Sequence, residues 1–196
     1  CDPAAFIIDA EFSDDAKEAV QEERFKDVIC LVRTIENLDG RFRPLNVRTM
    51  KESLAYNGGL DRVHTISYTS GTTGRPKGVI ISERYFQIGA KNAGLLADVR
   101  SDDVLFLWEP FYHIAGWMTV VMALQHGVPI AMVERFSGTH CWNQIRETGA
   151  TILHYLGGVM NILLKQAPQS NDKDNPIRIA WGAAAPSKSW REFEDR

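Results

Sequence analysis

Residues 68–79 read YTSGTTGRPKGV, a run with four Ser or Thr hydroxyls, three glycines and one lysine. Closely spaced glycines adopt positive φ angles without steric cost, so successive backbone N–H groups can converge on one point. The hydroxyls add donors, and the Lys77 ammonium is a compact charge that suits a phosphate oxygen. The run therefore predicts a loop that binds a polyphosphate. The alternative is a flexible Gly/Ser/Thr connector, but a connector needs no lysine, no proline and no strands at its ends.

The residues on either side distinguish this loop from a P-loop. In a P-loop, glycine directly precedes the lysine, serine or threonine directly follows it, and a helix begins there. Here Pro76 precedes Lys77, and residues 78–82 read GVIIS, a β-branched run typical of a strand. Residues 63–68 also read as a strand, and a helix is expected only over residues 83–97. The sequence thus predicts a phosphate loop between two strands.

The run resembles the phosphate-loop motif of the adenylate-forming superfamily, which includes acyl-CoA synthetases, firefly luciferase and the adenylation domains of peptide synthetases. Their motif reads Ser/Thr-Ser-Gly-Ser/Thr-Thr-Gly-x-Pro-Lys-Gly, and residues 69–78 meet every position. The resemblance implies that a carboxylate attacks the α-phosphate of ATP, giving an acyl-adenylate and pyrophosphate, usually followed by thioester formation with coenzyme A. By the family pattern, Lys77 has a catalytic role, and the β- and γ-phosphates are held by Thr69, Ser70, Gly71, Thr72, Thr73, Gly74 and Lys77.

A second segment, residues 109–117, reads EPFYHIAGW. It resembles the superfamily motif in which an aromatic pair is followed by a histidine and then a glycine. The resemblance implies that His113 lies beside the acyl group and the adenylate, and that Ala115, Gly116 and Trp117 line the acyl pocket, where Ala115 leaves room and Trp117 closes it. Taken alone, a histidine at a strand-to-helix junction is more often a packed structural residue.

A third segment, residues 179–186, reads IAWGAAAP and resembles the Gly-Gly-Ala-Pro segment that contacts the adenine ring. Small residues let the flat base approach the backbone. The candidates for adenine contact are Gly182, Ala183 and Ala184. The segment departs from the family pattern at three places: Ala183 replaces the second glycine, Trp181 replaces a small residue, and Pro186 comes one position late. The alternative is an ordinary strand end followed by a turn of small residues.

The extent of the resemblance predicts a single partial domain over residues 1–196, the central part of the large N-terminal domain of an adenylate-forming enzyme. At 196 residues and 22.0 kDa, the chain is long enough for one substantial core. It lacks the superfamily's Tyr-Gly-x-Thr-Glu segment, its Thr-Gly-Asp motif and its mobile C-terminal domain with the catalytic lysine. We therefore expect the Mg²⁺ ligands to lie mostly outside these residues, and the isolated chain to be inactive.

Composition argues against several other classes of protein. With 22 basic and 25 acidic residues the net charge is −3, so no basic field favours nucleic acid. The three cysteines are odd in number and widely spaced, which predicts neither a disulfide framework nor a metal site and favours a reducing cytoplasm. No signal peptide or membrane-spanning run is apparent. Apart from His113, the chain has four histidines, and none has a Cys, Asp or His partner at the spacing of metal ligands. Packing or surface roles are therefore expected for His64, His126, His140 and His154.

Alternating strand and helix patterns predict an α/β fold, a mainly parallel sheet with helices on both faces and ligands at the carboxyl ends of the strands. Residues 36–61 are polar and expected to be irregular. Strands are expected over residues 4–8, 28–32, 63–68, 78–82, 103–108, 128–133, 151–155 and 177–181, and helices over residues 13–23, 83–97, 114–126, 138–148 and 158–166.

Four functions remain open. An ATP-dependent acid–CoA ligase is favoured, with a small-molecule carboxylic acid, ATP and coenzyme A as its partners, because the first two motifs together look most like that branch. The adenylation domain of a peptide synthetase, a luciferase-like enzyme and a non-catalytic nucleotide-binding module are the alternatives. Acyl chains, aromatic acids and sterol-like acids all remain possible substrates.

Overall fold

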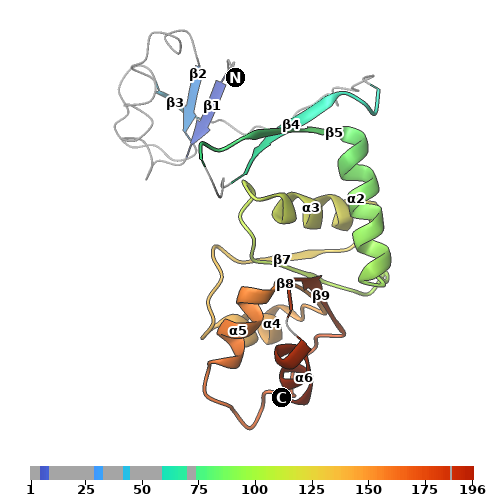
Figure 1. The fold of residues 1–196 in the computed structure, drawn as a ribbon, viewed down its shortest axis with the longest axis vertical. Coiled ribbons are helices and arrows are strands. Elements are labelled where there is room, and N and C mark those ends of the chain that lie inside the picture. The colour runs from blue at the N-terminus through green and yellow to red at the C-terminus, as the bar shows by residue number, and fades with distance from the viewer. Residues whose placement is uncertain (1–4, 9–28, 33–41, 45–58, 70–73, 186) are drawn as a thin grey trace. The chain divides into compact units, whose positions relative to one another are not determined.

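The computed structural model describes residues 5–8, 29–32, 42–44, 59–69, 74–185 and 187–196. The chain forms two compact units, Cys1–Tyr56 and Asn57–Arg196, which we call the N-terminal and C-terminal units. Both contain parallel β-sheet, as the sequence predicts (Figure 1).

The N-terminal unit contains a parallel sheet of three strands in the order β1-β2-β3: β1 (Ala5–Ile8), β2 (Ile29–Val32) and β3 (Phe42–Pro44). The first two confirm the expected strands. The third corrects the prediction that residues 36–61 are irregular. Three residues ending in proline carry no alternation to detect, and an edge position tolerates a residue without a backbone donor. The expected helix over residues 13–23 lies outside the described residues.

The C-terminal unit begins with an antiparallel hairpin of β4 (Val63–Tyr68) and β5 (Gly78–Ser82). Helix α2 (Glu83–Leu96) follows β5 directly, because the Ser82 side chain accepts a hydrogen bond from the Tyr85 N–H at 3.2 Å and caps the helix. The strand–loop–strand–helix order predicted around the phosphate loop is therefore confirmed.

The remainder of the unit is built on a four-stranded parallel sheet in the order β7-β6-β8-β9. Helices connect successive strands, and α3 and α4 both end at glycines with positive φ, Gly127 and Gly149. The elements are β6 (Leu105–Leu107), α3 (Ile114–His126), β7 (Ile130–Met132), α4 (Cys141–Thr148), β8 (Ile152–Leu156), α5 (Gly157–Leu164), β9 (Ile179–Ala183) and α6 (Ser187–Asp195).

Helix α6 is the element of the C-terminal unit that the sequence analysis misses. It has a polar surface with no fully buried residue, and it rests on the unit through aromatic contacts such as Trp142–Phe193, whose ring centroids are 5.9 Å apart. Few apolar residues in a short charged run give little helical periodicity to detect. The other helices of this unit were predicted to within a few residues at each end.

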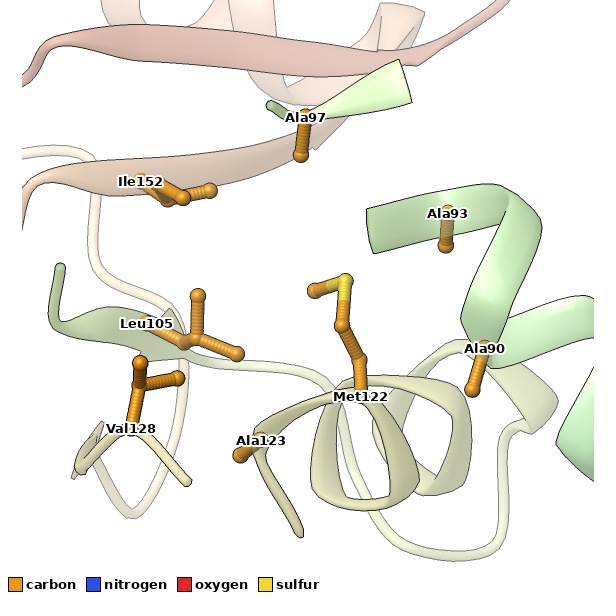
Figure 2. Close-up of a cluster of buried hydrophobic side chains, with 8 residues drawn as sticks. All are labelled: Ala90, Ala93, Ala97, Leu105, Met122, Ala123, Val128 and Ile152. Atoms are coloured by element: carbon orange, nitrogen blue, oxygen red, sulfur yellow. The ribbon is translucent and has the colours of Figure 1, made fainter. Parts of the chain in front are cut away.

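Side chains from the two faces of this sheet form two separate cores. Leu105 and Ile152 face α2 and α3, whereas Phe106 and Leu153, one residue later in each strand, face α4 and α5. Figure 2 shows Met122 projecting from α3 toward Leu105 and Ile152. Helices thus cover both faces, as the sequence predicts. The small residues that let α2 approach α3 are Ala90, Ala93 and Ala97.

A network of polar groups joins the amino ends of three strands in this sheet. Asp103, before β6, accepts hydrogen bonds from the Thr151 hydroxyl at 2.7 Å, the Arg178 Nε at 3.1 Å and the Arg100 N–H at 2.8 Å. Burial raises the pKa of Asp103, but these hydrogen bonds and the charge of Arg178 together lower that pKa to about 2. The carboxylate therefore stays ionised and holds the strands in register.

Candidate functional site

The two ends of the predicted phosphate loop are held together by the hairpin. The Thr69 N–H donates to the Lys77 carbonyl at 3.0 Å, one step beyond the last strand pair, Tyr68 and Gly78. Gly74 and Lys77 are exposed, and the Lys77 side chain has no hydrogen bond or ion pair with the described residues. Its ammonium is thus accessible from solvent. The predicted phosphate contacts Ser70, Gly71, Thr72 and Thr73 lie outside the described residues.

His113 is the N-cap of α3. Its ring Nδ1 accepts a hydrogen bond from the Ala115 backbone N–H at 3.2 Å. The backbone N–H of His113 donates to the Pro110 carbonyl at 3.0 Å. Because Nδ1 accepts, the hydrogen of the neutral ring sits on Nε2. The side chain is exposed, so Nε2–H is available to donate to a ligand. His113 thus has a structural role through Nδ1, and its ring Nε2–H is accessible to a ligand.

The first turn of α3 packs closely against the loop before it. Gly116 is buried, and a Cβ on this residue would lie 2.5 Å from the Pro110 carbonyl oxygen and 3.0 Å from that of Glu109. Only glycine allows this approach without a shift of backbone. Ala115 is half-buried and its carbonyl accepts the Thr119 hydroxyl at 3.0 Å. Substrate contact by Ala115 and Gly116 stays a prediction.

Trp117 belongs to an aromatic cluster that joins α3 to β4, α2 and the loop before α3. Its ring centroid lies 6.0 Å from that of His64, 6.5 Å from that of Phe86 and 6.0 Å from that of Phe111. The ring centroids of His64 and Phe86 are 4.8 Å apart, so His64 has a packing role, which is one of the roles expected from the sequence. Trp117 remains 39% exposed, which leaves part of its ring accessible. Its substrate contact also stays a prediction.

The predicted adenine segment lies at the end of β9, and partly within it. Gly182 and Ala183 are the last two residues of the strand, which the sequence analysis ended at residue 181, and Ala184 follows with φ of 61°. A Cβ on Gly182 would lie 1.9 Å from the Tyr155 carbonyl oxygen, and one on Gly157 would lie 1.8 Å from that of Ala184. Two glycines therefore let the end of β9 lie against the junction of β8 and α5. Gly182, Ala183 and Ala184 are exposed.

Buried polar side chains connect the second and third motifs, and the sequence analysis gave them no functional role. Glu109 and His154 are hydrogen bonded through Oε1 and Nδ1, and the His154 ring lies 4.5 Å from that of Trp181. The available signal was a charged residue, Glu109, at the start of the segment that contains His113. Among the described residues, the phosphate loop makes no hydrogen bond, ion pair or ring contact with His113 or with Gly182, Ala183 and Ala184.

Two other features contain none of the predicted site residues. A cavity of about 360 Å³ lies on the α4–α5 side of the sheet and is lined by residues that include Trp142, Leu163 and Phe193. Cys141 is fully buried, and burial raises the pKa of its thiol to about 12, so it is no nucleophile at neutral pH.

The sequence of the chain matches a known protein family. The family model described as AMP-binding enzyme matches residues 1–196. The chain belongs to the AMP-binding enzyme family. Its relatives include the mouse (Mus musculus) long-chain fatty acid transport protein 6, which is 32% identical over 131 residues, a match covering 66% of this chain and 21% of the mouse protein. The chain thus spans about a fifth of the length of that mouse relative.

Solved structures of similar fold include the following two proteins. The inhibitor-bound N-terminal domain of FACL13 from Mycobacterium tuberculosis has a TM-score of 0.78 and 23% identity, covering 96% of this chain and 47% of that one. O-succinylbenzoate coenzyme A synthetase from Bacillus subtilis, in complex with AMP, has a TM-score of 0.61 and 24% identity, covering 70% of this chain and 28% of that one. Both show that this chain shares their fold.

No group of three or more His, Cys, Asp or Glu side chains in the described part of the chain is arranged to hold a metal ion. Within the same residues, no helix has both the length and the apolar character needed to cross a membrane.

Proposed function

We propose that the full-length protein is an ATP-dependent acid–CoA ligase. It would join a carboxylic acid to AMP as an acyl-adenylate and then transfer the acyl group to coenzyme A. One observation carries the proposal: in a chain of the AMP-binding family, the Thr69–Lys77 hydrogen bond ties the two described ends of YTSGTTGRPKGV together, and residues 74–77 of this run are exposed.

The described part of the loop fits a polyphosphate. A lysine already paired with a carboxylate would argue against phosphate binding, whereas the Lys77 side chain is exposed and has no polar partner among the described residues. Lys77 would neutralise oxygens of the β- and γ-phosphates, and the loop N–H and hydroxyl groups would complete the cradle. These contacts orient ATP and stabilise the departing pyrophosphate.

His113 and the end of β9 would bind the other parts of the adenylate. The Nε2–H of His113 is an exposed donor on a ring whose orientation is set by the helix cap, which suits contact with the acyl or phosphate oxygens of the adenylate. Gly182, Ala183 and Ala184 present small side chains, or none, at an exposed strand end, where a flat base can lie against the backbone.

Two further participants are implied by the resemblance. Mg²⁺ would neutralise phosphate charge, but the described residues contain no cluster of three or more potential ligands and do not by themselves fit the ion. Coenzyme A is proposed as acceptor because a solved neighbour is named as a coenzyme A synthetase. Residues 1–196 alone are expected to be inactive, and we propose a cytoplasmic setting.

The acid is proposed to carry an apolar chain, because the mouse relative described above is named for the transport of long-chain fatty acids. Trp117 would limit the depth of the acyl pocket, since its bulky ring is held by His64, Phe86 and Phe111. Aromatic and sterol-like acids are the alternatives for the same pocket.

The test is acid-dependent exchange of radiolabelled pyrophosphate into ATP, using the full-length protein and a panel of fatty, aromatic and sterol-like acids. We expect exchange with at least one acid, and an acyl-CoA product by mass spectrometry once coenzyme A is added. Exchange with product formed only on a carrier protein would identify a peptide-synthetase-type domain instead. Nucleotide binding without any exchange would identify a non-catalytic module.

A further inference from the structure

Two buried polar side chains and one partly buried indole ring form a cluster after β6 and within β8 and β9. Glu109 follows β6 and is 5% exposed, His154 lies in β8 and is 9% exposed, and Trp181 lies in β9. The Glu109 Oε1 is hydrogen bonded to the His154 Nδ1, and the rings of His154 and Trp181 are 4.5 Å apart. We call these residues the Glu109–His154–Trp181 cluster.

On one side, the cluster is continuous with the loop that places His113. Glu109 lies four positions before His113, and the carbonyls of Glu109 and Pro110 contact Gly116 in the first turn of α3. The Pro110 carbonyl also accepts the His113 N–H at 3.0 Å. The position of the Glu109 backbone therefore helps to set where α3 begins and where the His113 ring lies.

On the other side, the cluster is continuous with the predicted adenine segment. His154 pairs in register with Trp181, and the next two pairs are Tyr155 with Gly182 and Leu156 with Ala183. The His154 carbonyl also accepts the Trp108 indole N–H at 2.8 Å, which ties β8 to the residue before Glu109. A displacement of His154 would thus move both the loop after β6 and the end of β9.

The Glu109–His154 hydrogen bond is hard to replace. The Glu109 side chain is buried, and its Oε2 has no hydrogen-bond partner among the described residues, so His154 is its single described polar partner. If a buried carboxyl group loses its hydrogen-bond partner, water cannot replace that partner, so the desolvation of the group is no longer compensated. An exposed carboxyl group would instead be hydrated by solvent. The loop and the strand are therefore held in one arrangement relative to each other.

We propose that Glu109 and His154 are positioning residues that hold the His113 loop and the adenine-binding end of β9 in mutual register. The proposal rests on the proposed function, because it assumes that both segments bind the adenylate. Neither residue touches the reacting atoms. Their effect reaches the substrate through His113 on one side and through Gly182 and Ala183 on the other.

The test is a double-substitution cycle in the full-length protein. Glu109→Met and His154→Phe remove the hydrogen bond while keeping similar volume, and the phenyl ring still packs on Trp181. Glu109→Gln and His154→Asn are the conservative variants, because each keeps a polar group that can form the hydrogen bond. The measurements are pyrophosphate exchange, thioester formation from supplied acyl-adenylate, and AMP affinity by titration calorimetry.

We expect Glu109→Met and His154→Phe each to lower kcat/KM about tenfold in both half-reactions, and to weaken AMP binding. The double variant should lose no more than about twofold beyond the worse single one, because the two residues act as a unit. Glu109→Gln and His154→Asn should each recover most of the loss.

Asp103→Asn is the matched control, because Asp103 is a buried, hydrogen-bonded carboxylate at the opposite end of β6. It should lower the melting temperature and leave the kinetics unchanged. Unchanged kinetics in Glu109→Met, or losses that multiply in the double variant, would overturn the positioning role. If the wild-type protein exchanges no pyrophosphate, the proposed function fails and AMP affinity alone decides the register proposal. A wild-type protein without AMP affinity overturns both.

Discussion

Lys77 and His113 differ in how much the fold depends on them. The Lys77 side chain is exposed and makes no polar contact with the described residues, so its removal should cost little stability. His113 caps α3 through Nδ1, so its removal affects the helix, and under the proposed function it also removes a contact to the adenylate. Substitutions at these two residues therefore have different expected signatures.

Lys77→Ala should slow adenylation about ten- to a hundredfold, which corresponds to the loss of one charge-assisted contact of about 1.5–3 kcal/mol. Thioester formation from supplied acyl-adenylate should be nearly unchanged, because the adenylate no longer carries the β- and γ-phosphates. Pyrophosphate exchange and acyl transfer measure the two rates. Arg75→Ala, which removes an exposed charge from the same loop, is the control. Equal losses in both half-reactions would show that Lys77 has been assigned the wrong ligand.

His113→Ala should slow both half-reactions and also destabilise the protein by about 0.5–2 kcal/mol through loss of the helix cap. His113→Asn separates the two effects, because asparagine caps helices well but has no group that replaces Nε2–H. We expect near-normal thermal stability and low activity for His113→Asn. Full activity in this variant would mean that His113 serves α3 alone.

At the scale of elements, the interface of α2 and α3 with the sheet depends on the fit of a few side chains. Met122 is 1% exposed and lies among the alanines of α2 and the apolar residues of β6 and β8 (Figure 2). A cavity left there would border two helices and two strands. The packing therefore links the helix that His113 begins to the strand that contains His154.

Met122→Ala should lower the free energy of unfolding by about 2–5 kcal/mol, because it removes buried apolar contacts and leaves a cavity. Leu124→Ala is the control on the same helix, since Leu124 is 77% exposed, and it should change stability by no more than about 0.5 kcal/mol. Urea unfolding followed by circular dichroism gives both values. Similar losses for the two variants would contradict the position of Met122 in the core.

At the scale of the whole C-terminal unit, the amino ends of the strands in the four-stranded sheet form one edge and their carboxyl ends form the opposite edge. The two edges contain different groups of polar residues. The amino edge is joined by Asp103, Thr151 and Arg178, none of which belongs to a predicted ligand-binding segment. The carboxyl edge contains the Glu109–His154–Trp181 cluster and the end of β9. The separation allows the amino edge to stabilise the sheet without contacting the candidate site.

The amino edge makes stability depend on acidic pH. Because the folded-state pKa of Asp103 is about 2, below the ordinary value of 3.8, its contribution is present above about pH 4 and is lost as the pH falls toward 2. The contribution corresponds to about 2 kcal/mol. Asp103→Asn should lower the melting temperature at pH 6, and its difference from wild type should narrow as the pH falls from 4 to 2. A constant difference over that range would exclude this linkage.

Much of the fold and part of the candidate site follow from local sequence. The β-branched runs on either side of YTSGTTGRPKGV are sufficient to predict β4 and β5, and the periodic apolar residues of α2 and α3 predict both helices to within one residue. The exposure of Lys77 and the position of His113 at the start of a helix also agree with their motifs. Such features depend on residues close together in the chain, which a sequence pattern records directly.

Tertiary structure decided the features that depend on distant residues. Strand β3 exists because it pairs with β2, and Gly182 and Ala183 belong to β9 because they pair with Tyr155 and Leu156. Glu109 and His154 are 45 residues apart in the chain, and no local pattern relates them. The sequence by itself determined the two strands on either side of YTSGTTGRPKGV and the family, and it predicted that the run between them binds phosphate. Only the folded sheet, which brings the carboxyl ends of separate strands to one edge, decided that a buried carboxylate and a histidine join the second motif to the third.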